Sequence, residues 1–146
     1  MMSTTSRKKI TGLFAPLKRM MTEILLEEGV DQAELSVSFV GRSMIRRLNS
    51  DYLNHDRVTD VISFNLSEGA GGALVGDIYI CVLVARDQAV RFGVSPQEEL
   101  FRLAAHGVYH LLGCDHEDES DRERMFALQE RAVQRYFKSS WAGKFF

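Results

Sequence analysis

The segment from Ser95 to Gly113 constrains the fold more than any other part of the chain. Ser95 is a preferred helix N-cap, Pro96 suits the first helical turn, and Glu98 stands three residues after the cap, so together they predict a helix start. Gly113 is typical of the residue that follows a helix. Between these ends the apolar residues lie on nearly all sides of the helix: Leu100, Phe101, Leu103, Ala104, Ala105, Val108, Tyr109, Leu111 and Leu112. A helix of this kind has to be covered all round, which predicts a buried central helix.

The rest of the chain alternates between helical and strand patterns. Apolar residues recur at helical spacing before Gly29 and again near the end of the chain, where a helix begins in an acidic run. Apolar residues that alternate with serine, and β-branched runs on either side of a glycine-rich loop, predict strands. The further helices are predicted near residues 13–25, 44–48, 85–92 and 117–136, and the strands cover residues 35–39, 61–66 and 73–81.

Length and composition place these elements in one domain, residues 1–146. The chain is 45% hydrophobic, which is enough for a core, and no linker or internal repeat divides it. Two cysteines are too few for a disulfide framework and no apolar leader opens the chain, so we expect a cytoplasmic protein. The longest apolar stretches, such as Ile78 to Ala85, are far shorter than the roughly 20 residues that cross a bilayer, and no membrane contact is expected.

The net charge of −2 gives no overall attraction to nucleic acid, so any RNA contact has to be local. One basic patch covers residues 7–9. Another comprises Arg42, Arg46 and Arg47, with Arg57 further along the chain. Such patches are also typical of a solvated helix face, and charge alone does not distinguish the two interpretations.

Three of the four histidines fall within eleven residues: His106, His110 and His116. Residues four apart on a helix project from the same face, so His106 and His110 can present two imidazole nitrogens to one metal ion. Gly113 lets the chain turn, and His116 can then serve as a third ligand with a fourth position left for water or substrate. Three imidazoles in a tetrahedral site favour one Zn²⁺ per chain, although nickel, copper or iron would also accept these ligands.

The histidine spacing equals that of the metzincin peptidases, but Gly107 occupies the position of their glutamate. That carboxylate takes the proton from zinc-bound water, so ordinary zinc proteolysis is not expected. Asp115 is a candidate for a weak base or for a partner of His116, and is equally well explained as a loop residue. Cys114 is better explained as a small buried apolar residue than as a metal ligand.

The segment from His106 to His116 closely resembles the signature of the YbeY family of bacterial endoribonucleases. Leu48, Asn49, Tyr52 and Asp56, with the run from Thr59 to Phe64, resemble the upstream motif of the family. The residues around Gly76, Asp77 and Ile78, with Ile80 and Cys81, resemble its middle strand. These matches follow one another in the order of the family and span residues 48–116.

The resemblance implies an α+β fold in which a small mixed β-sheet of three or four strands is flanked by about five helices, with the zinc site on the central buried helix. It implies a zinc-dependent, single-strand-specific endoribonuclease that acts in 3′-end maturation of small-subunit (16S) rRNA and in ribosome quality control. Small-subunit ribosomal proteins and an assembly GTPase are the partners it implies. It assigns zinc to His106, His110 and His116, and it suggests that Ser63, Asp77 and Thr59 shape the cleft, where strand-end hydrogen bonding and turn formation explain them equally well.

One position departs from the family pattern. The family usually carries an arginine after the residue matched by Tyr52, regarded as important for RNA cleavage, and this chain has Leu53 there. Arg57 follows four residues later, and with Arg46 and Arg47 it is our candidate for phosphate contact. Two alternatives to the nuclease stay open: a ribosome-assembly binding factor with structural zinc and little nuclease activity, and a metal-dependent hydrolase of other substrates.

Overall fold

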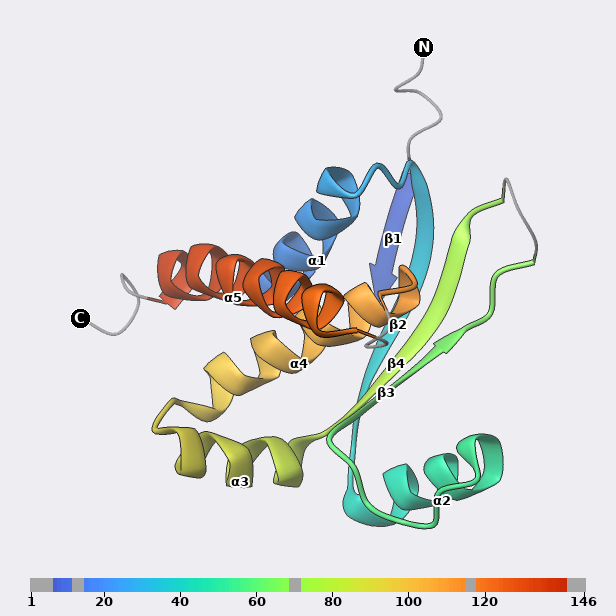
Figure 1. The fold of residues 1–146 in the computed structure, drawn as a ribbon, viewed down its shortest axis with the longest axis vertical. Helices are drawn as coiled ribbons and strands as arrows, with labels where there is room; N and C mark the ends of the chain where they lie inside the picture. The colour runs from blue at the N-terminus through green and yellow to red at the C-terminus, as the bar shows by residue number, and fades with distance from the viewer. Residues whose placement is uncertain (1–6, 12–14, 69–71, 115–117, 142–146) are drawn as a thin grey trace.

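The computed structural model describes residues 7–11, 15–68, 72–114 and 118–141. These ranges contain four strands and five helices, and the last three helices follow one another along the chain (Figure 1). The elements are β1 (Arg7–Thr11), α1 (Ala15–Glu27), β2 (Gln32–Val40), α2 (Arg42–Leu53), β3 (Val61–Asn65), β4 (Leu74–Cys81), α3 (Val82–Phe92), α4 (Pro96–Leu111) and α5 (Glu119–Trp141).

The strands form one mixed sheet in the order β1-β2-β4-β3. β1 pairs with β2 in parallel, and the crossover helix α1 connects the two strands. β2 also pairs with β4 in parallel, so that Leu35 lies opposite Gly76. β3 runs antiparallel to β4 and forms one edge of the sheet, where Asn65 also lies opposite Gly76. This edge strand lies next to the central helix, which makes it part of the surroundings of the histidines.

Helices cover the two faces of the sheet unequally. α1, α4 and α5 lie on one face, where α4 contacts both β3 and β4, whereas α2 lies on the other face (Figure 1). Because side chains alternate along a strand, Ile78 points toward α4 and its neighbours Asp77 and Tyr79 point toward the α2 side. α1 and α4 therefore both contact the sheet, and α5 packs on these two helices.

The main core fills the space between the sheet and the three helices α1, α4 and α5. α4 contributes more fully buried large side chains than a surface helix would, including Tyr109 and Phe101. A second, smaller cluster lies under α2 and comprises Ile45, Ile62 and Cys81. The main cluster contains Ile10, Leu17, Met20, Met21, Ile24, Leu25, Leu35, Val37, Ile78, Ile80, Phe101, Val108, Tyr109, Leu111, Met125 and Val133 among others.

The fold class expected from the family resemblance is confirmed: the protein is α+β, with a small mixed sheet and five helices in the described ranges. The sheet has four strands, and the strand at residues 7–11 is the one that the residue pattern did not predict. The buried central helix is α4, as the apolar pattern predicted. No helix in the described part of the chain combines the length and the apolar character that crossing a membrane requires.

Candidate metal and RNA site

Local sequence signals define both ends of α4, the helix that carries the two histidines. The Ser95 side chain accepts a hydrogen bond from the Glu98 backbone N–H at 3.1 Å, with Pro96 at the helix start. At the other end Gly113 adopts a φ of 86°, which suits glycine, and its N–H donates to the His110 carbonyl at 3.0 Å. The helix thus ends just after its second histidine.

The two helical histidines lie side by side on one face of α4. The ring centres of His106 and His110 are 4.9 Å apart with an interplanar angle of 61°. Two imidazoles that bind one ion at about 2 Å per nitrogen have ring centres roughly 5 Å apart at a tetrahedral angle. His106 is half-buried and His110 is exposed, so this donor pair fits a metal ion that is reachable from solvent.

The remaining metal-site candidates, His116 and Asp115, lie outside the described residues. Within the described ranges, no group of three or more His, Cys, Asp or Glu side chains is placed to hold a metal ion. The assignment of His116 as third ligand and of Asp115 as a base therefore stays a prediction. Cys114 is half-buried and packs against the main core, as expected of a small apolar residue.

The close packing around Gly107 explains why a glutamate does not follow the first histidine. A Cβ atom at this position would lie 2.9 Å from Cγ2 of Ile78 and 3.1 Å from Oγ of Ser63. The Ser63 hydroxyl donates to the Gly107 carbonyl at 3.1 Å, which ties β3 to the helix beside His106. The glycine allows α4 to contact the sheet closely, and a glutamate there would meet β4.

A hollow of about 310 Å³ opens beside His106, between α4 and the first turns of α5. Its lining includes the Arg122 side chain, which also pairs with Glu119 at 2.8 Å and is 54% exposed. An arginine here offers a cation close to the metal-ligand candidate, where a phosphate would need one. No spacing rule connects Arg122 with His106, so sequence reasoning missed it. The lining residues are His106, Arg122, Met125, Phe126 and Gln129.

A partly buried polar network lies behind His106, at the contact between α4 and α5. Nδ1 of His106 lies 2.9 Å from Oε1 of Gln129, whose side-chain Nε2 donates to Glu130 at 3.2 Å. Arg102 donates to both oxygens of Glu130, from Nε at 2.7 Å and from Nη2 at 2.9 Å. Arg102 also pairs with Glu99 of its own helix at 2.9 Å, whereas its pair with Glu130 links α4 to α5.

Burial and hydrogen bonds shift the pKa values of the two carboxyls Glu99 and Glu130 in opposite directions. Burial raises the pKa of the Glu99 carboxyl, and the hydrogen bond from Arg102 opposes that shift only in part. Burial also disfavours the charged form of Glu130, but hydrogen bonds from Arg102 and Gln129 outweigh it and lower the pKa of that carboxyl. The hydrogen bond with Glu130 raises the pKa of the Arg102 guanidinium. Glu130 and Arg102 are therefore a charged pair at neutral pH.

The arginines proposed from the sequence for RNA contact lie elsewhere. Arg46 and Arg47 belong to α2, on the sheet face opposite α4, and Arg57 belongs to the loop between α2 and β3. Arg46 pairs with Asp56, at 2.8 Å from Nε, and this hydrogen bond raises the pKa of the guanidinium and lowers that of the carboxyl. The strands β3 and β4 thus lie between α2, which carries Arg46 and Arg47, and the helix of the histidine pair.

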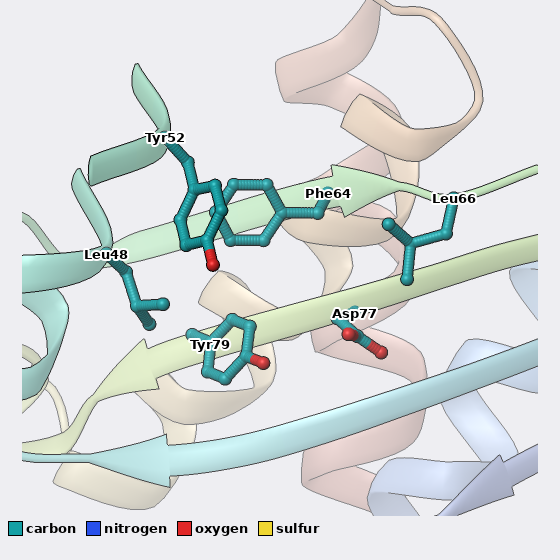
Figure 2. Close-up of a pocket in the computed structure, with 6 residues that line it drawn as sticks. All are labelled: Leu48, Tyr52, Phe64, Leu66, Asp77 and Tyr79. Atoms are coloured by element: carbon teal, nitrogen blue, oxygen red, sulfur yellow. The ribbon is translucent and has the colours of Figure 1, made fainter. Parts of the chain in front are cut away.

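A second hollow, of about 240 Å³, lies on this α2 face (Figure 2). Figure 2 shows the rings of Tyr52 and Phe64 close together, with Tyr79 below them and the Asp77 carboxylate nearby. Phe64 makes edge-to-face contacts with both tyrosines, at centroid distances of 5.5 and 5.9 Å. Asp77 accepts a hydrogen bond from Ser36 on β2 at 2.6 Å. The lining residues are Leu48, Tyr52, Phe64, Leu66, Asp77 and Tyr79.

Thr59 and Leu53 are the remaining positions singled out in the sequence. Thr59 lies in the turn before β3 with its hydroxyl 3.4 Å from Asp60, so it contributes to that turn. Leu53, which stands where the family usually has arginine, is the last residue of α2 and is 42% exposed. It follows Tyr52 at the rim of the aromatic hollow.

Comparisons with known proteins show which family this chain resembles. A family model described as Endoribonuclease YbeY matches residues 3–137. The protein named endoribonuclease YbeY in Staphylococcus carnosus is 42% identical over 131 residues, covering 84% of this chain and 86% of the relative. One of the same name in Chlorobium luteolum is 37% identical over 134 residues, covering 92% and 95%. The solution structure of TM1509 from Thermotoga maritima matches with a TM-score of 0.62 and 26% identity, covering 94% of this chain and 93% of that chain. The chain therefore belongs to the endoribonuclease YbeY family.

Proposed function

We propose that this chain is a zinc-dependent endoribonuclease that hydrolyses phosphodiester bonds of single-stranded RNA. The observation that carries the proposal is the pair formed by His106 and His110, whose rings share one face of α4 beside an open hollow. Membership of a family whose relatives are named endoribonucleases supports the reaction class. His116 would complete the set of ligands for one Zn²⁺ per chain.

We assign each residue a proposed role from its place in the structure. When bound, zinc would act as a Lewis acid toward the scissile phosphate. Arg122 would hold a phosphate oxygen from the same hollow, and its planar guanidinium suits that contact. Arg46, Arg47 and Arg57 would contact a part of the RNA farther from the histidines, on the other side of the edge strand β3. Asp115 is our candidate for the base.

Within this proposal the substrate is the 3′ end of small-subunit rRNA in the cytoplasm, and the reaction serves rRNA maturation and ribosome quality control. Small-subunit ribosomal proteins and an assembly GTPase are the partners that the family resemblance suggests. These assignments rest on the resemblance, whereas the hydrolase class rests also on the histidine geometry.

A ribosome-assembly binding factor with structural zinc is the second candidate. The observation in its favour is Leu53 at the end of α2, since a leucine cannot donate hydrogen bonds to a phosphate. Under this alternative the histidines would stabilise the fold and RNA would bind without being cut. The alternative and the nuclease differ in what a histidine substitution does to turnover and to melting temperature.

The deciding experiment compares zinc-loaded wild-type protein with His110→Ala on a single-stranded RNA that spans the 3′ end of small-subunit precursor rRNA. His55→Ala is the matched control, because His55 is an exposed histidine in the loop after α2. We expect cutting by the wild type and the control, background cutting by His110→Ala, and no cutting of the same RNA in a duplex. Equal cutting by all three proteins would overturn the metal-dependent nuclease. Absence of cutting, with a lower melting temperature only for His110→Ala, would support the assembly factor.

A further inference from the structure

The side chain behind His106 determines which of its ring nitrogens carries a proton. A neutral imidazole has one N–H donor and one acceptor nitrogen, and the hydrogen-bond partner selects between them. At Nδ1 of His106 the partner is the Gln129 side chain, whose Oε1 lies 2.9 Å away, and Gln129 is 6% exposed. An amide offers an acceptor at its oxygen and donors at its nitrogen, so the orientation of Gln129 decides the tautomer.

Glu130 fixes that orientation. Its Oε2 atom lies 3.2 Å from the amide nitrogen Nε2 of Gln129. An ionised carboxylate only accepts hydrogen bonds, so the amide end that faces it has to be the NH₂ group. The opposite end of the amide, the oxygen Oε1, therefore faces the ring of His106 and accepts from its Nδ1–H.

Arg102 keeps Glu130 ionised and in place. Its guanidinium donates to both carboxylate oxygens in a fork, and this planar geometry defines the plane of the carboxylate. Arg102 lies one helical turn before His106 on α4, while Gln129 and Glu130 lie on α5. The packing of α4 against α5 thus sets the direction of each hydrogen bond, from Arg102 to Glu130, from Gln129 to Glu130 and from His106 to Gln129.

We propose that Gln129 is a positioning residue for the metal site, held by the Arg102–Glu130 pair. It keeps the proton of His106 on Nδ1, so that Nε2 carries the lone pair for the metal and the ring stays in one orientation. This inference rests on the proposed role of His106 as a metal ligand. Partners of this kind behind a ligating histidine are worth roughly 10- to 100-fold in metal affinity.

The first test needs no substitution. Nitrogen-15 NMR of the histidine rings in metal-free wild-type protein, above the pKa of the ring, reports which nitrogen of His106 carries the proton. We expect the Nδ1–H form. A spectrum of the Nε2–H form would overturn the assignment whatever the metal does.

The second test measures zinc affinity by competition with a chelator for wild type, Gln129→Met and Gln134→Met. Methionine keeps the length of the side chain without the amide, and Gln134 is an exposed glutamine on the same helix. We expect Gln129→Met to lose about 10- to 100-fold in affinity and its His106 to lose the Nδ1–H form, with the control unchanged. Unchanged affinity in Gln129→Met would overturn this inference alone. Failure of the wild type to bind zinc would overturn the proposed function and the inference with it.

Discussion

Replacing Gly107 by alanine tests how closely α4 has to approach the sheet. The added Cβ would stand 2.9 Å from Cγ2 of Ile78, against an ordinary carbon contact of about 3.5–4.0 Å. The helix cannot move away without stretching the 3.1 Å hydrogen bond from Ser63 to the Gly107 carbonyl. Overpacking of this kind costs about 1–3 kcal/mol, and the better helix propensity of alanine offsets about 0.5–1 kcal/mol. We expect a net loss of about 0–2.5 kcal/mol in the free energy of unfolding.

Urea denaturation followed by circular dichroism measures this loss. For a chain of this size, each kcal/mol lowers the melting temperature by about 2–4 °C. Gly72→Ala is the matched control, because a Cβ there meets nothing within 4 Å, and its effect should stay within about 0.5 kcal/mol. The double variant with Ile78→Ala removes the clashing methyl group, so the two substitutions should couple favourably by at least about 0.5 kcal/mol.

A stabilisation by Gly107→Ala would refute this reasoning. A glycine in an uncrowded helix gains about 0.5–1 kcal/mol when it becomes alanine. That outcome would mean that α4 has room against β4 and that the missing glutamate has no steric explanation. Gly107→Glu should then also fold, whereas we expect it to be far less stable than Gly107→Ala.

Two further predictions concern charges near the site. The pKa of Glu130 is lowered in the folded state, so its contribution to stability is present above its ordinary value of 4.5 and is lost as the pH falls through the lower folded value. Glu130→Gln should therefore flatten the decline of unfolding free energy at acid pH, and an unchanged decline in a urea series would contradict the assigned shift. Arg122→Ala should weaken RNA binding and reduce the slope of log K against log salt by about 1, as titrations at several salt concentrations would show. Arg131→Ala, an arginine of α5 that pairs with Glu27 at 3.0 Å, should change neither value.

The sequence predicted the central helix and the histidine pair because their signals are local. The serine cap, the glycine after the helix and a spacing of four residues each depend on a few neighbouring positions. The strand β1 lacked such a signal, since residues 7–11 are mostly charged or polar and lie in a sheet only through parallel pairing with β2. The strand order likewise depends on contacts between distant segments.

The polar surroundings of the histidines were missed for the same reason. Gln129 reaches His106 across 23 positions of sequence, and Arg122 shares a hollow with it, through the packing of α5 on α4 alone. Similarly, Arg46 stands out in the sequence as part of a basic patch, but its exposed ion pair with Asp56, ten positions away, is visible only in the structure. Composition gives the number of charges, whereas the tertiary fold decides which of them pair with one another.

The position of the histidines on a core helix would link the proposed metal binding to the stability of one helix contact. His106 is half-buried, and the Gln129 side chain behind it belongs to α5, which the Arg102–Glu130 fork holds against α4. Local opening of α5 would release the amide before it disrupts the contact of α4 with the sheet, because α4 is also held to β3 through Ser63. Substitutions at the α4–α5 contact should therefore lower zinc affinity at denaturant concentrations where the sheet is still folded.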